Sequence, residues 1–126
     1  MSGPIQVAVC DDARAVKLFL RHVLEEDGDM LVVSATSTGS ALLAELVEHR
    51  PDALLLDLLL PDVSDPSALV RTLRERSPEM AILLISNMPS FRLEEEAARL
   101  GVDGWVPKAH KPEDLRDAVR QIVASR

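Results

Sequence analysis

The sequence lacks the features that mark several large classes of protein. Its 126 residues include a single cysteine, Cys10, which cannot form an internal disulfide and offers no metal cluster. The longest apolar runs, such as 53–56 and 81–85, fall far short of the roughly 20 residues that span a bilayer. No basic segment followed by an apolar stretch opens the chain, as it would in a secretory signal. We therefore expect a cytoplasmic protein that does not enter the membrane.

Basic side chains are also in the minority. The chain has 14 Lys and Arg against 21 Asp and Glu, which gives a formal net charge of −7. Nucleic-acid backbones select basic surfaces, so this balance predicts no direct contact with nucleic acid. Neither a G-x-G-x-x-G segment nor a P-loop motif is present, which disfavours nucleotide binding. The 47% of hydrophobic residues are regularly spread, so we expect one folded domain over residues 1–126.

The sequence does contain a regular alternation of short apolar runs and amphipathic segments. The runs at 5–10, 31–33, 53–56, 81–85 and 105–106 predict strands. Between them, apolar residues recur at helical spacing: Val16, Phe19, Leu20, Val23 and Leu24; Leu42, Leu43, Leu46 and Val47; Leu69, Val70 and Leu73; Leu93, Ala97 and Leu100; Leu115, Ala118, Val119, Ile122 and Val123. Five strands alternating with five helices predict an α/β fold with a parallel sheet and right-handed crossovers.

Residues that begin or end helices support these boundaries. The Ser-Thr pair at 37–38 is suited to cap the second helix, and Asp65 followed by Pro66 is suited to begin the third. Gly101 is placed to end the fourth helix. Asp12 could cap the first helix, a structural role that is compatible with a functional one.

Polar or charged side chains follow four of the five predicted strands. They are Asp11 and Asp12 after the first strand, Asp57 after the third, Ser86 after the fourth and Lys108 after the fifth. Ligands of open parallel sheets bind at the carboxyl ends of the strands, so these side chains converge if the four strands are near neighbours. Carboxylates about 4 Å apart repel by roughly 4 kcal/mol per pair at an effective dielectric near 20. Either one carboxylate stays protonated or a cation fills the gap. Oxygen ligands without His or Cys favour Mg²⁺ over zinc, so the pattern predicts a Mg²⁺–phosphoryl site.

The same residues resemble the receiver domain of two-component response regulators. Asp11-Asp12, the Asp-Leu-Leu-Leu-Pro segment at 57–61, Ser86 and the Gly-Trp-Val-Pro-Lys segment at 104–108 match its motifs, in order, over essentially the whole chain. The stretch 108–115 is similar to the NarL/LuxR-type subgroup, which has a proline four residues after the lysine. The resemblance implies a flavodoxin-like (CheY-like), doubly wound five-stranded parallel sheet in the order 2-1-3-4-5 with five helices.

The resemblance also implies an acceptor and a metal site. Asp57 would accept a phosphoryl group from a sensor histidine kinase or a phosphotransfer protein. Mg²⁺ would be held by Asp11, Asp12 and Asp57, with the backbone carbonyl of Leu59 as a further ligand. A carboxylate nucleophile and a hard cation are the groups that phosphoryl transfer requires, so the resemblance and the chemistry agree.

Three further residues would respond to the phosphoryl group. Lys108 would pair with its oxygens, Ser86 would hydrogen-bond to it, and Trp105 would take the place of the switch aromatic, although plain packing explains a tryptophan there almost as well. The domain would catalyse at most its own phosphorylation and dephosphorylation, so it would be a signalling domain and not an enzyme. Its output would be a switched surface for a downstream protein or domain, or a homodimer.

Alternatives remain open at this point. Ser64-Asp65 and Asn87 depart from the usual receiver pattern, which leaves room for a phosphorylation-independent receiver-like interaction module. The chain could also be the receiver fragment of a NarL/LuxR-type transcription factor. A haloacid-dehalogenase-like phosphatase is disfavoured because that family places Asp-x-Asp after the first strand, whereas Asp11-Asp12 is followed by Ala13.

The histidines and the cysteine are expected to be structural. His22, His49 and His110 have no metal-like spacing and are predicted to lie at the surface. Cys10 lies in the first strand and is predicted to be a small buried hydrophobic residue.

Overall fold

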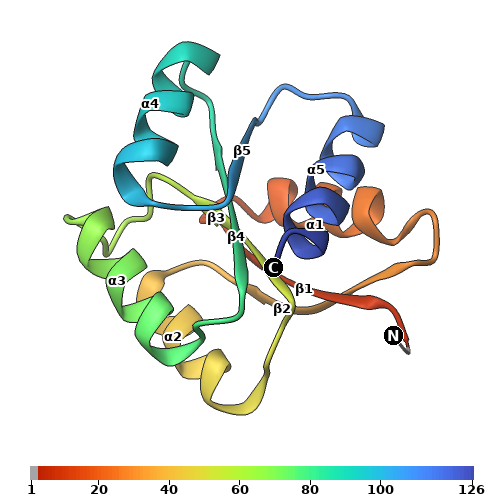
Figure 1. The fold of residues 1–126 in the computed structure, drawn as a ribbon, viewed down its shortest axis with the longest axis horizontal. Helices are drawn as coiled ribbons and strands as arrows, with labels where there is room; N and C mark the ends of the chain where they lie inside the picture. The colour runs from red at the N-terminus through yellow and green to blue at the C-terminus, as the bar shows by residue number, and fades with distance from the viewer. Residues whose placement is uncertain (1–2) are drawn as a thin grey trace.

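Five strands and five helices alternate along residues 3–126, the part of the chain that a computed structural model describes (Figure 1). The strands are β1 (Ile5–Cys10), β2 (Met30–Thr36), β3 (Ala53–Asp57), β4 (Ala81–Ser86) and β5 (Gly104–Pro107). The helices are α1 (Arg14–Glu25), α2 (Gly39–Glu48), α3 (Pro66–Arg76), α4 (Ser90–Leu100) and α5 (Pro112–Ala124). Each helix follows the strand of the same number, as the alternating pattern predicted.

All five strands are parallel and lie in the order β2-β1-β3-β4-β5. The doubly wound, flavodoxin-like topology is therefore confirmed, and β1, β3, β4 and β5 are neighbours as the predicted site requires. β2 and β5 extend beyond the apolar runs at 31–33 and 105–106. The reason is that backbone pairing with the neighbouring strand continues past the residues whose side chains are apolar, for example between Ser86 and Pro107.

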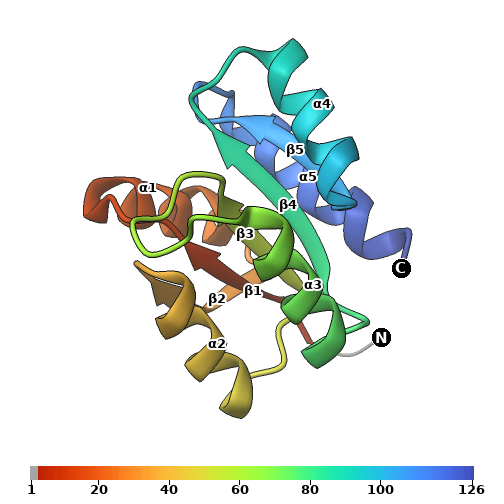
Figure 2. The same ribbon diagram turned by 90° about the vertical axis from the view of Figure 1, so that its left-hand side faces the viewer.

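The helices cover both faces of the sheet. In Figures 1 and 2, α1 and α5 lie on one face and α2, α3 and α4 on the other. Side chains of the central strands alternate between the two layers: Leu54 and Leu56 pack toward α2, α3 and α4, and Leu55 packs toward α1 and α5. A central strand that is apolar on both faces is thereby confirmed. Within residues 3–126, no helix is long and apolar enough to cross a membrane.

Two residues of the predicted helix stripes lie outside the core. Val47 is 76% exposed and Phe19 is 48% exposed, whereas Leu46 and Leu20 beside them are buried. Neighbouring residues on a helix point about 100° apart, so a stripe four residues wide extends past the arc that a flat sheet covers. The helical spacing of Val47 and Phe19 is therefore confirmed, but neither side chain is part of the core.

The helix boundaries that the sequence predicts are formed by the expected residues. The hydroxyl of Thr38 accepts a hydrogen bond from the backbone N–H of Ala41 at 3.1 Å and caps α2. Asp65 caps α3 by accepting from two backbone N–H groups of its first turn, and Pro66 is the first helical residue. Gly101 ends α4 with φ of 72°, a left-handed conformation that glycine adopts without steric cost.

Candidate functional site

Three carboxylates meet at the carboxyl ends of β1 and β3. Asp11 and Asp12 follow the last residue of β1, and Asp57 is the last residue of β3. One oxygen from each of the three side chains lies within 4.8 Å of the others. Asp11 and Asp57 are buried, with 0% and 4% exposed, whereas Asp12 is exposed. The structure thus brings together the acidic residues that the sequence predicts to converge.

Lys108 reaches these carboxylates from the loop after β5. Its Nζ lies 2.8 Å from Oδ2 of Asp11 and 3.5 Å from Oδ2 of Asp57. The backbone N–H of Lys108 donates a hydrogen bond of 2.8 Å to the carbonyl of Ser86, which holds the start of the loop against the end of β4. The ammonium group therefore balances part of the negative charge of two buried acids.

Ser86 ends β4, next to the strand that carries Asp57. It is 2% exposed, and its hydroxyl accepts a hydrogen bond of 3.2 Å from the backbone N–H of Met88. This hydrogen bond gives the serine a structural role in the turn after β4. Its position beside β3, where Ile85 pairs with Asp57, also places it at the edge where the carboxylates meet.

The environment of the site shifts two pKa values upward. Burial is the largest cause that raises the pKa of Asp57 above its ordinary value, and the negative charge of Asp11 adds to it. A hydrogen bond from the backbone of Leu59 and the charge of Lys108 oppose this shift without cancelling it. Burial disfavours the ammonium of Lys108, but contacts with Asp11 and Asp57 outweigh it and raise its pKa. The site thus holds more negative charge than Lys108 alone balances.

Asp12 does not cap α1, so that structural alternative is wrong. The N-cap residue is Ala13, and no side chain makes a capping hydrogen bond at this helix. Instead Asp11 accepts a hydrogen bond of 2.9 Å from the backbone N–H of Ala13, because its carboxylate folds back over the turn. The carboxylate of Asp12 stays exposed beside the two buried acids.

The loop after β3 contains an acid that the sequence analysis missed. Asp62 accepts hydrogen bonds from the backbone N–H groups of Gly39 at 2.8 Å and Ser40 at 3.0 Å, the first residues of α2. These bonds hold the pKa of Asp62 below its usual range. They also tie the loop that carries Leu59 to a helix more than twenty residues earlier. An acid beside a helix N-terminus is recognisable only once the two segments are known to be adjacent.

Trp105 lies in β5, half-buried, and packs against the apolar layer shared with α2, α3 and α4. In the sheet it pairs with Leu84 of β4. The packing role of Trp105 is therefore confirmed. Its switch role stays a prediction.

The fold and the acidic edge define a class of protein: a doubly wound domain with buried aspartates and a lysine at the strand ends. Residues 7–120 match the family model of the response regulator receiver domain. The chain therefore belongs to this family, whose members are signalling domains.

The chain is similar to individual transcriptional and response regulators. It is 30% identical to the transcriptional activator protein ExaE of Pseudomonas putida, over 94% of this chain and 55% of that protein. It is 27% identical to the response regulator protein VraR of Staphylococcus aureus, over 93% of this chain and 56% of that protein. The chain thus spans little more than half the length of these relatives. Among solved structures, the signal receiver domain of the Mycobacterium tuberculosis response regulator NarL is similar, with a TM-score of 0.88, 25% identity and coverage of 99% and 100% of the two chains.

Proposed function

We propose that the chain is a single receiver domain that accepts a phosphoryl group on Asp57. The observation that carries this proposal is the buried carboxylate of Asp57 at the end of β3, which shares the ammonium of Lys108 with Asp11. A carboxylate with no structural partner other than a loop N–H and a lysine is costly to bury, and it is suited to act as a nucleophile.

The residues fit a bound Mg²⁺ ion. Oxygen atoms of Asp11, Asp12 and Asp57 lie within 4.8 Å of one another, and hard cations prefer such ligands. Burial, together with the charge of Asp11, raises the pKa of Asp57, and a nearby cation would favour its ionised form. In this proposal the three carboxylates and the Leu59 carbonyl would hold the ion, which would neutralise charge on the phosphoryl oxygens.

The residues of this chain would carry out the transfer in one step. A carboxylate oxygen of Asp57 attacks phosphorus, an O–P bond forms, and the P–N bond to the donor histidine breaks with its electron pair returning to the imidazole. Lys108 is within reach of Asp57 and would pair with the oxygens of the transferred group. Response regulators interact with histidine kinases, and we propose such a kinase, or a phosphotransfer protein, as the donor.

The response would be a shift between two conformations. If the active conformation is about 1% populated before phosphorylation, roughly 2.7 kcal/mol brings it to one half. New charge-assisted hydrogen bonds from Ser86 and Lys108 are sufficient for that. We propose that Ser86 moves toward the phosphoryl group and that Trp105 turns inward behind it. Unchanged Trp105 emission in the phosphorylated protein would contradict this coupling.

The output is proposed to be contact with a downstream protein or domain and not direct contact with nucleic acid, in keeping with the net charge of −7. The name of ExaE describes a transcriptional activator, but the present chain matches only 55% of that protein. The cytoplasmic location expected from the sequence remains part of this proposal.

The decisive experiment is intact mass after incubation with Mg²⁺ and acetyl phosphate. Wild type should gain one phosphoryl group, and the adduct should be absent without Mg²⁺ and in Asp57→Asn. Asp65→Asn is the matched control, since this acid lies in the loop that follows β3 but caps α3 and should not affect the adduct. Because some receivers ignore small donors, a phosphorylated histidine kinase serves as second donor. No adduct from either donor would overturn the proposal and favour the phosphorylation-independent module.

A further inference from the structure

Two hydrogen bonds hold the peptide group between Pro107 and Lys108. Its N–H, which belongs to Lys108, donates to the carbonyl of Ser86 at 2.8 Å. Its carbonyl oxygen, which belongs to Pro107, lies 2.9 Å from Nδ1 of His110. A peptide group is planar, so contacts at both of its polar ends fix the orientation of the plane. The direction in which the Lys108 side chain leaves the backbone is therefore constrained.

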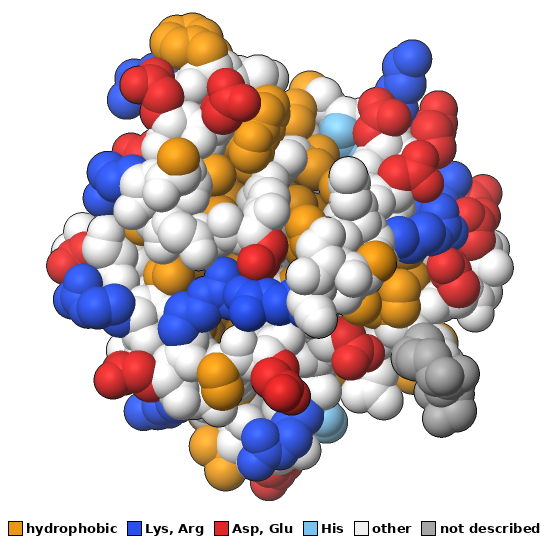
Figure 3. Space-filling model, in the orientation of Figure 1, with side chains coloured by type: hydrophobic (Ala, Val, Ile, Leu, Met, Phe, Trp, Pro, Cys, Tyr) orange, Lys and Arg blue, Asp and Glu red, His pale blue; other side chains and the backbone are white. Residues whose placement is uncertain are grey.

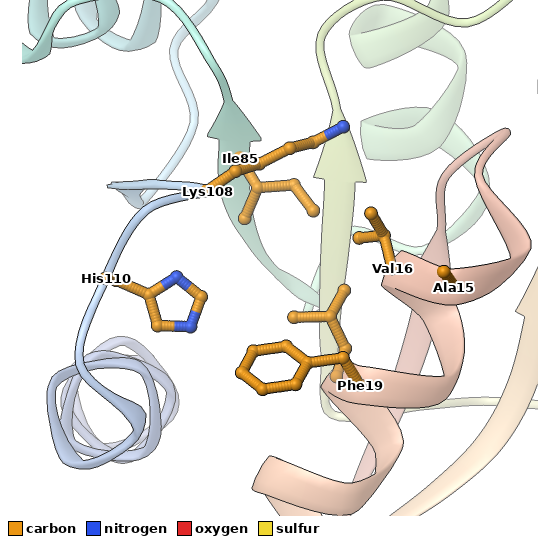
Figure 4. Close-up of a pocket in the computed structure, with 7 residues that line it drawn as sticks. Ala15, Val16, Phe19, Ile85, Lys108 and His110 are labelled. Atoms are coloured by element: carbon orange, nitrogen blue, oxygen red, sulfur yellow. The ribbon is translucent and has the colours of Figure 1, made fainter.

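The Lys108 side chain depends on this constraint because it is not closely packed on all sides. Its stem lines one wall of a cavity of about 210 Å³ between α1 and the loop from β5 to α5. Figure 4 shows the stem next to Ile85, with Nζ directed away from the cavity. A long side chain that borders open space keeps many rotamers. The orientation of the backbone at Lys108 therefore contributes directly to the position of Nζ beside Asp11 and Asp57.

The contact with Pro107 assigns the proton of the neutral His110 ring. A carbonyl oxygen only accepts hydrogen bonds, so Nδ1 is the donor and Nε2 carries the lone pair. Nε2 is buried and has no hydrogen-bond partner within residues 3–126, so the prediction that His110 lies at the surface is wrong for this atom. A buried acceptor without a donor lowers stability, and a hydrocarbon ring would avoid that loss. The distinctive contribution of a histidine here is therefore the donor at Nδ1.

An aromatic side chain of α1 lies against the imidazole. The rings of Phe19 and His110 are 6.3 Å apart, centroid to centroid, at an angle of 49°, and Figure 4 shows them next to each other. Tilted rings at this distance attract each other. Phe19 is 48% exposed, so the core of the sheet holds only part of its side chain. Its contact with His110 links α1 to the loop that carries Lys108.

We propose that His110 is a positioning residue for Lys108. Its Nδ1–H holds the carbonyl of Pro107, and the peptide group fixed in this way keeps the ammonium of Lys108 beside Asp11 and Asp57. This role rests on the proposed function, in which Lys108 pairs with the oxygens of the transferred group. Within residues 3–126, neither ring nitrogen of His110 contacts the two acids, so His110 acts only through Lys108.

The test is the effect of Lys108→Met in four backgrounds: wild type, His110→Phe, His110→Asn and His22→Phe. Urea unfolding in EDTA gives the unfolding constant of each protein without a metal ion or a phosphodonor. In wild type, Lys108→Met should raise this constant, because two buried acids lose their cation. His110→Phe keeps a ring but removes the donor, so the ammonium is already displaced. In that background the increase should be smaller by at least about threefold.

The other two backgrounds identify the hydrogen bond as the cause. The amide nitrogen of asparagine is as many bonds from Cβ as Nδ1 of histidine, so His110→Asn keeps a donor for the carbonyl of Pro107. There Lys108→Met should raise the unfolding constant as much as in wild type. His22→Phe is the matched control, since His22 is an exposed histidine of α1, and it should also behave like wild type. If His110→Phe does not fold, His110→Leu takes its place.

The rate of phosphorylation connects this role to the proposed function. With Mg²⁺ and acetyl phosphate, His110→Phe should form the Asp57 adduct roughly three- to tenfold more slowly than wild type, part of the effect of one charge-assisted hydrogen bond. His110→Asn should stay close to wild type, and His110→Phe should not slow Lys108→Met further. A wild-type protein that takes up no phosphoryl group would contradict the proposed function, whereas the unfolding comparison would still decide the role of His110.

Two results would overturn the proposal. One is an equal effect of Lys108→Met on the unfolding constants of wild type and His110→Phe. The other is an effect in His110→Asn as small as in His110→Phe, which would mean that the hydrogen bond to Pro107 does not hold Lys108 in place.

Discussion

At the scale of single residues, Asp57 combines burial with charge. The side chain is 4% exposed and close to a second buried acid, Asp11, and one lysine serves both. The raised pKa of Asp57 expresses the resulting cost of ionisation. An acid whose pKa is higher in the folded state than in the unfolded chain lowers the stability of the protein when it ionises. The reason is that the unfolded chain loses this proton at a lower pH than the folded state does. Ionised Asp57 therefore lowers the free energy of unfolding of the protein.

Asp57→Asn should stabilise the protein in the absence of Mg²⁺. Removing an incompletely balanced buried charge should raise the free energy of unfolding at pH 7 by about 1–3 kcal/mol. The measurement is urea unfolding of both proteins in EDTA. Asp12→Asn is the control, because Asp12 is exposed and its change should stay within about 0.5 kcal/mol. A destabilised Asp57→Asn protein would show that Lys108 balances the charge fully.

The advantage of Asp57→Asn should depend on pH with a defined sign. Above its raised pKa, Asp57 is ionised in wild type and the variant is more stable. As pH falls through that pKa toward the ordinary value of 3.8, wild type gains stability relative to the variant, and the difference should vanish once Asp57 is neutral in both states. Unfolding curves of both proteins between pH 4 and 8 measure this. A difference that is constant with pH would contradict the assignment.

Lys108→Met should have the opposite effect. It leaves Asp11 and Asp57 without their cation, so stability without Mg²⁺ should fall by about 1–3 kcal/mol. Adding Mg²⁺ should recover part of the loss, since a second cation then balances the acids. Lys111→Met, at an exposed position in the same loop, is the control and should change little. Thermal unfolding with and without Mg²⁺ tests both statements.

At the scale of elements, the loop from β3 to α3 is held by hydrogen bonds to two helices. Asp62 holds the first residues of α2, and Asp65 begins α3. The loop packs closely against the start of α2, because a Cβ added to Gly39 would lie 2.8 Å from Cγ2 of Val63. The loop that follows Asp57 is thus held by helices on both sides, which limits the positions that Leu59 adopts.

Asp65→Ala should weaken α3 without disturbing the carboxylates. Loss of this N-cap leaves two backbone N–H groups of the first turn without their acceptor, at 3.1 and 3.3 Å in wild type, and should cost about 1 kcal/mol. Urea unfolding measures the loss. Ser64→Ala, the exposed neighbour outside the helix, should leave stability unchanged within error. Equal effects of the two variants would exclude the capping role.

At the scale of the whole molecule, stability comes from the two apolar layers more than from the charged surface. Figure 3 shows acidic and basic side chains next to each other at the right-hand edge, where Figure 1 places α1 and α5. Arg116 and Arg120 of α5 pair there with Glu26, Asp27 and Asp29 of the turn after α1. Arg116 is only 11% exposed, but the acids of these pairs are 45–56% exposed and remain open to water. Each pair therefore contributes at most about 1 kcal/mol. Burial of the central strands contributes more.

Leu54→Ala should destabilise the protein by about 2–5 kcal/mol. The side chain is fully buried between the sheet and the layer of α2, α3 and α4, so its removal leaves a cavity. Leu59→Ala is the matched control, since this leucine is 72% exposed and its truncation should cost less than about 0.5 kcal/mol. Chemical unfolding of the two variants gives the comparison. A similar cost for both would mean that Leu59 packs in solution.

Most of the fold was predictable from the sequence because its signals are local. The apolar run at 53–56, the cap at Asp65 and the stop at Gly101 each depend on neighbouring residues, and all three are confirmed. What the sequence did not predict depends on distant segments. Val47 is exposed because the sheet covers only part of the α2 stripe, and His110 is half-buried because its loop turns back toward α1.

The sequence by itself determined the order of the helices and strands, the family, and which side chains follow the strands. Hydrophobic periodicity, helix-capping residues and the order of the motifs can all be recognised from residues that are close together in the chain. Only the tertiary structure decided that Asp11, Asp57 and Lys108 share one buried site, that Asp62 binds the first residues of α2, and that the ring of His110 lies beside that of Phe19. Those contacts join residues far apart in the chain. Their energies depend on burial and distance, which arise only when the parallel strands bring their carboxyl ends together.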